Sequence, residues 1–75
     1  MQFIERINKA LNKQNLEFVD YKEYNEKFKG YLLDKTDNYK IKFEINKGLR
    51  LDMLKSWSSF CKEHIELHKK VIGGK

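Results

Sequence analysis

The chain has 75 residues, which allows one small domain and excludes the large enzyme folds that enclose a deep cleft. It carries 16 Lys and Arg against 11 Asp and Glu, and the formal net charge of +5 favours phosphates, acidic proteins or anionic lipid as partners. A single cysteine excludes an internal disulfide framework and indicates a reducing compartment, so we expect a cytoplasmic protein. The sequence shows no signal segment and no apolar run of about 18 residues, so we expect no membrane partner.

Residues 2–14 are predicted to form a helix, because apolar residues recur there at three- and four-residue spacing. From residue 16 the period changes to two, which is typical of strands. We predict strands at Leu16–Tyr24, Lys27–Leu33 and 39–46, joined by turns at 25–26 and 34–37. This order favours an antiparallel meander.

A second helix is predicted over residues 52–72, with its larger side chains on one face. Those residues are Leu54, Trp57, Phe60, Cys61, His64, Leu67, His68 and Val71. Before this helix, Leu49 and Leu51 could form a short fourth strand or a connecting loop. The predicted fold class is therefore α+β: a helix, a three- or four-stranded antiparallel meander and a helix, with both helices on one face of the sheet. We expect one domain over residues 1–75, with a mobile tail at 73–75.

A loop at 34–37 sets a predicted register in which Tyr31 lies opposite Lys40 and Lys29 lies opposite Lys42. Alternation then gives one apolar face and one basic face. The predicted basic face consists of Lys22, Lys27, Lys29, Tyr31, Lys40 and Lys42. Lysines bind phosphates as point charges and a tyrosine can stack on a base, although a solvated surface would show the same pattern.

The basic face favours a non-catalytic protein that contacts the backbone of nucleic acid, with RNA slightly favoured over DNA. Such a protein could block or escort a nucleoprotein or a nuclease. Lysine outnumbers arginine 14 to 2, which argues against bidentate reading of bases. We therefore expect contacts with phosphates rather than with base edges.

Two apolar residues, Phe18 and Leu33, are predicted on the same side as Tyr31 and suggest a partner interface. On this basis we expect a homodimer or an obligate protein partner. A strand bulge that turns Phe18 inward is the alternative. The second functional hypothesis follows from this patch: a protein–protein inhibitor or adaptor, such as a phage-type inhibitor of host defence.

The candidate metal ligands are Cys61, His64 and His68, because their spacing places three possible ligands on one helical face. No second cluster of such residues completes a zinc site, and Glu66 is misplaced for the His-Glu-x-x-His pattern. The sequence also shows no phosphate-binding loop and no evident pair of catalytic carboxylates. We therefore expect no metal, no cofactor and no catalytic residues, and we assign no family.

Overall fold

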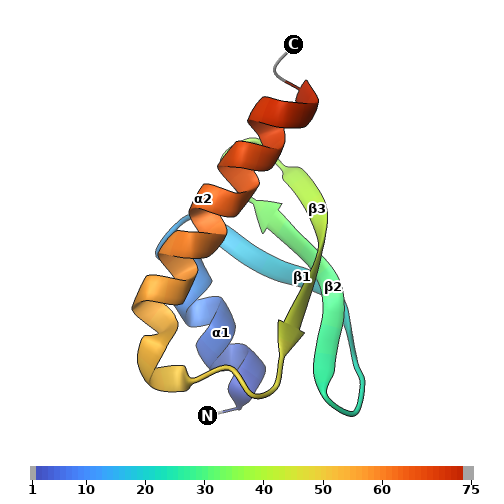
Figure 1. Cartoon of the computed structure of the whole chain (residues 1–75), viewed down its shortest axis with the longest axis vertical. Coiled ribbons are helices and arrows are strands. Elements are labelled where there is room, and N and C mark those ends of the chain that lie inside the picture. The colour runs from blue at the N-terminus through green and yellow to red at the C-terminus, as the bar shows by residue number, and fades with distance from the viewer. Residues whose placement is uncertain (1, 74–75) are drawn as a thin grey trace.

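The computed structural model describes residues 2–73 and confirms the predicted α+β fold (Figure 1). The elements are α1 (Phe3–Asn12), β1 (Leu16–Glu23), β2 (Lys27–Asp34), β3 (Tyr39–Asn46) and α2 (Leu54–Gly73), with a 3-10 turn at Leu51–Met53. Asn15 ends the first helical segment in the left-handed conformation, with φ 61°. Asparagine tolerates that conformation better than most residues do, so the chain can reverse into β1.

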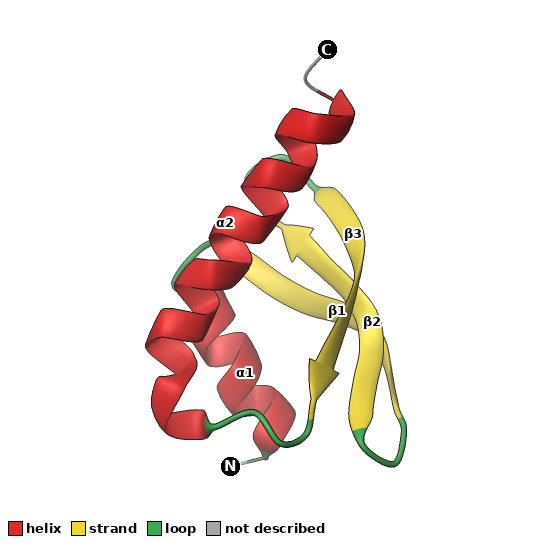
Figure 2. Cartoon of the chain, in the orientation of Figure 1, coloured by secondary structure: helices red, strands yellow, loops and turns green. Residues whose placement is uncertain are grey.

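The three strands form one antiparallel sheet in the order β1-β2-β3, so β1 and β3 are its edges. Both helices lie on the same side of this sheet, and α2 runs diagonally across the view in Figure 2. Within residues 2–73 there is no fourth strand, because Leu49 lies in the connection and Leu51 begins the 3-10 turn. Of the tail predicted at 73–75, Gly73 is the last residue of α2 and 74–75 lie outside the described residues.

The core lies between the helices and the inner face of the sheet. Its buried apolar side chains are Ile7, Leu11, Leu16, Phe18, Phe28, Leu32, Ile41, Ile45, Cys61 and Ile65. In β2 and β3 these residues alternate with the predicted lysines, as strand geometry requires. The lysine side chains are therefore on the face that no helix covers.

The predicted register between β2 and β3 is wrong by two residues. Tyr31 lies opposite Lys42, and Lys29 lies opposite Glu44. The turn occupies residues 35–38, with Asn38 at φ 60°, and Asp34 therefore already pairs with Tyr39. A shift of two residues preserves the side-chain alternation, so the apolar and basic faces stay as predicted.

A β-bulge in β1 overturns the predicted position of Phe18. Val19 pairs with Tyr31 but Lys22 pairs with Lys29, so two residues of β1 lie opposite Gly30 alone. The extra residue reverses the alternation, and Asp20 takes a positive φ of 53° at this point. Phe18 consequently faces the core and is only 1% exposed.

A buried carboxylate joins the end of β2 to α2. Asp34 accepts hydrogen bonds from Lys69 Nζ at 2.6 Å and from the Thr36 backbone N–H at 2.9 Å, and Lys62 Nζ lies 3.6 Å away. Burial alone would raise the pKa of Asp34, but these partners outweigh it and lower the pKa to about 2.

No helix in the described part of the chain is long and apolar enough to cross a membrane.

Candidate nucleic-acid interface

The outer face of the sheet, which we define by Lys22, Lys27, Lys29, Tyr31, Lys40 and Lys42, collects every residue of the predicted basic face. The three strands contribute Lys22 from β1, Lys29 from β2 and Lys42 from β3. Cross-strand neighbours on one face lie within about 8 Å of one another, including diagonal pairs. The fold therefore gathers cations that are up to 20 positions apart in the sequence.

Two of the predicted lysines are engaged in ion pairs. Lys27 Nζ lies 3.0 Å from Glu44, and Lys40 Nζ lies 3.1 Å from Asp20. The hydrogen bond from Lys27 holds the pKa of Glu44 below its usual value, so that carboxylate stays ionised and paired with Lys27. Lys40 also stands over the ring of Tyr31, with Nζ 5.0 Å from the ring centroid.

The other three lysines, Lys22, Lys29 and Lys42, form no ion pair with any residue in 2–73. They line a shallow hollow of about 340 Å³ together with Tyr24 and Tyr31. Asp20 and Glu44 also line this hollow, but each has its own lysine partner. The net local charge is therefore positive beside two aromatic rings.

The predicted apolar patch on this face is smaller than expected. Phe18 is buried in the core, so its assignment to a partner interface is wrong. Leu33 does lie on the outer face, where it pairs with Glu17 and Lys40, and it is half-buried. Tyr31 is also half-buried.

The three candidate metal ligands, Cys61, His64 and His68, make contacts within the fold. Cys61 is fully buried, and burial raises the pKa of its thiol to about 12. The Nδ1 atom of His68 lies 2.9 Å from the hydroxyl oxygen of Tyr39, and the ring of His64 packs against Phe43. Among the described residues, no three His, Cys, Asp or Glu side chains are grouped so that they could hold a metal ion.

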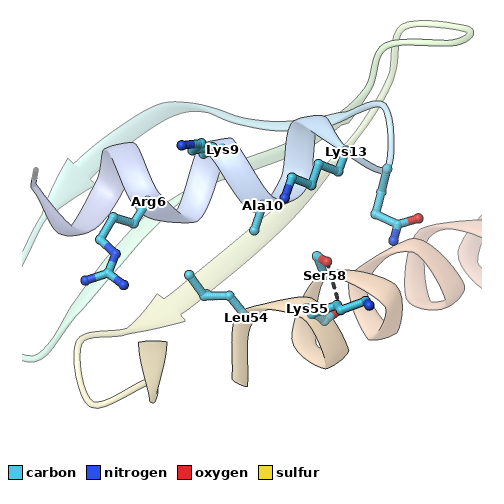
Figure 3. Close-up of a pocket in the computed structure, with 8 residues that line it drawn as sticks. Arg6, Lys9, Ala10, Lys13, Leu54, Lys55 and Ser58 are labelled. Carbon is cyan, nitrogen blue, oxygen red and sulfur yellow. Dashed lines mark hydrogen bonds between the residues drawn. The ribbon is translucent and has the colours of Figure 1, made fainter. Parts of the chain in front are cut away.

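A second basic surface, which the sequence analysis missed, lies between α1 and α2 (Figure 3). This α1–α2 groove has a volume of about 500 Å³. Its lining residues are Arg6, Lys9, Ala10, Lys13, Gln14, Leu54, Lys55 and Ser58. None of them is acidic or aromatic. The three- and four-residue spacing of Arg6, Lys9 and Lys13 on one helix was the available signal, but Lys55 joins them only through the tertiary fold.

Comparison with protein-family models, with curated proteins and with solved structures found no match. The outer face offers cations with aromatic rings, whereas the α1–α2 groove offers cations over an aliphatic floor.

Proposed function

We propose that this chain binds the phosphate backbone of single-stranded nucleic acid on the outer face of its sheet. The observation that carries the proposal is the set of three lysines, Lys22, Lys29 and Lys42, around the hollow that contains Tyr24 and Tyr31. Among residues 2–73 these lysines form no ion pair. Lysines there neutralise phosphates without regard to sequence, and tyrosine rings accept any base by stacking. Binding of this kind would shield the strand from a nuclease or escort it within a nucleoprotein.

Single strands fit the outer face better than a duplex does, because stacking on Tyr24 or Tyr31 requires unpaired bases. RNA is slightly favoured over DNA, since single-stranded RNA is the usual target of small modules that combine a sheet with exposed aromatic rings. The α1–α2 groove has four cations but no ring, so it can hold a phosphate without offering a base any platform.

The alternative function, a protein–protein inhibitor or adaptor acting through the sheet, now has weaker support. Its predicted interface included Phe18, which is buried, and the remaining Leu33 and Tyr31 are half-buried. We therefore place nucleic-acid binding ahead of it.

The test is a fluorescence titration of labelled 15-mers of rU and dT over a range of salt concentrations. Three phosphate contacts on a single strand predict a slope of log affinity against log salt of about −2, and a loss of about 20-fold between 50 and 200 mM salt. Replacing Lys29→Glu and Lys42→Glu together should weaken binding at least tenfold for both polymers and flatten the slope by about 1.5.

The matched control is Lys9→Glu with Lys13→Glu, which makes the same charge change in the α1–α2 groove. This variant should bind within threefold of wild type. If it loses binding while the sheet variant keeps it, the proposal for the outer face is wrong and the groove is the site. If wild type binds neither polymer at 50 mM salt, the nucleic-acid proposal fails altogether.

A further inference from the structure

The helix α2 carries a second row of apolar side chains that is not part of the core. Phe60, Leu67 and Val71 are 64%, 60% and 72% exposed, although all three are large and apolar. The core-facing row of the same helix is distinct and consists of Leu54, Ser58, Cys61 and Ile65. A solvated helix face normally carries polar residues, so this second row is unpartnered surface.

The second row has the spacing of a coiled-coil seam. We define the α2 seam as Trp57, Phe60, His64, Leu67 and Val71, which follow one another at intervals of three, four, three and four residues. Trp57, at one end of the seam, is partly buried against the core. That alternation is the pattern by which one helix packs along another. The seam borders β3, because both Trp57 and His64 pack against Phe43, with ring centroids 6.4 and 6.0 Å away.

We propose that the α2 seam binds the α2 seam of a second copy of this chain in antiparallel orientation. The charged residues beside the seam, Glu63 and Lys70, indicate that its partner is a second copy of this chain. Placing His64 opposite Leu67 of the second copy brings Phe60 opposite its Val71. In the same register, Glu63 lies beside Lys70 of the second copy, and the two-fold axis repeats this ion pair.

Other pairings of two α2 seams lose that complementarity. Sliding the second copy by seven residues keeps the apolar rows aligned but places Glu63 beside Glu63 of the second copy. A parallel pair would bring Glu63 toward His68 of the second copy, whose ring already lies within hydrogen-bond distance of Tyr39. Neither Glu63 nor Lys70 forms an ion pair with any residue in 2–73, so both are available for the contact.

This contact is independent of the proposed nucleic-acid interface. The α2 seam lies on the helix layer, whereas Lys29 and Lys42 are on the opposite side of the sheet. A dimer joined through α2 would present two outer faces, both free. Loss of dimerisation and loss of nucleic-acid binding are therefore separable by measurement.

The experiment is sedimentation equilibrium of the purified chain at concentrations up to about 100 μM, since dimerisation follows mass action. We expect twice the chain mass. Leu67→Ser, at an exposed position, should raise the dimer dissociation constant at least tenfold while leaving the circular dichroism spectrum unchanged. The Lys29→Glu, Lys42→Glu variant should remain a dimer.

Charge swaps test the register. Glu63→Lys alone and Lys70→Glu alone should each weaken self-association at least fivefold, because each places like charges beside one another twice. A mixture of the two single variants should form a heterodimer, and the double variant should recover the wild-type dissociation constant. A monomer at about 100 μM overturns the proposal. So does a dimer that survives Leu67→Ser, and a mixture that shows no rescue overturns the antiparallel register.

Discussion

The side chain of Asn8 hydrogen bonds both backbone groups of Phe18. Its Oδ1 accepts from the Phe18 N–H at 2.7 Å, and its Nδ2 donates to the Phe18 carbonyl at 3.4 Å. A side-chain amide thus takes the place of a neighbouring strand at the free edge of β1. Such a contact satisfies backbone groups that would otherwise invite pairing with another chain.

Replacing Asn8→Ala should therefore lower the free energy of unfolding by about 1–3 kcal/mol, because two partly buried backbone groups lose their partner. Urea denaturation with fluorescence detection measures this. Asn25→Ala is the matched control, since Asn25 is exposed in the β1–β2 turn, and it should cost less than about 0.5 kcal/mol. Equal costs for the two variants would mean that the Asn8 contacts contribute nothing.

Gly30 allows the bulged strand to approach β2. A Cβ atom at this position would lie 2.7 Å from the Tyr21 Cα and 2.8 Å from the Val19 carbonyl oxygen. We expect Gly30→Ala to destabilise the protein by about 1–3 kcal/mol, because backbone atoms must move apart. Gly48→Ala meets only the Asn46 side chain at 3.0 Å, so it should melt within a few degrees of wild type.

The low pKa of Asp34 predicts a pH dependence of stability. A carboxylate whose pKa falls from 3.8 to about 2 on folding stabilises the native state above pH 4, and this contribution disappears as the pH falls from 4 to 2. We assign it about 1–2 kcal/mol, because Lys69 remains partly exposed. Between pH 4 and 2, the Asp34→Asn variant should therefore lose about 1–2 kcal/mol less stability than wild type.

The control for this titration is Asp37→Asn, which removes an exposed carboxylate from the same lysine at 3.0 Å. It should retain most of the wild-type dependence on pH. A profile for Asp34→Asn that parallels wild type between pH 4 and 2 would contradict the prediction.

Cys61 should be inert in the native state. Its side chain is fully buried and its pKa is raised to about 12, so almost no thiolate is available to a thiol reagent. We expect labelling only at the rate of unfolding, and rapid labelling in denaturant. An exposed cysteine introduced by Ser56→Cys on the same helix provides the fast reference.

Tyr31→Ala should weaken binding to the rU 15-mer by about 1–3 kcal/mol, the usual contribution of a stacked ring, and should change duplex binding much less. Tyr31→Phe keeps the ring and should bind like wild type. Equal losses on single strands and duplexes would show that Tyr31 does not stack on bases.

The sequence correctly predicted which residues of β2 and β3 face the core, because the face of a side chain depends only on whether its position in the strand is odd or even. Phe28 and Leu32 face the core whether the turn begins at residue 34 or 35, although the register itself was wrong by two. This alternation predicts the wrong face beyond a point where the strand contains an extra residue. The bulge at Asp20 reverses it, which is why Phe18 was predicted on the wrong face.

Helical periodicity was less discriminating along α2. Residue spacing predicts Cys61 and Phe60 on one face of the helix, but the structure buries Cys61 and exposes Phe60. Two apolar rows lie side by side on this helix, and spacing alone cannot say which row meets the sheet. The cation of Lys55 in the α1–α2 groove was likewise unpredictable, because its neighbours come from the other end of the chain.

The three strands lie in the sheet in the same order as in the chain, and this order favours fast formation of the hairpins. Each strand pairs with the next across a turn of a few residues, so both hairpins need only short loops to close. The helices meet across a much longer stretch, as in the hydrogen bond from Gln14 to Ser59, 45 positions apart. We expect the hairpins to be structured in the transition state and α2 to dock afterwards, with φ-values higher at Leu32 than at Ile65.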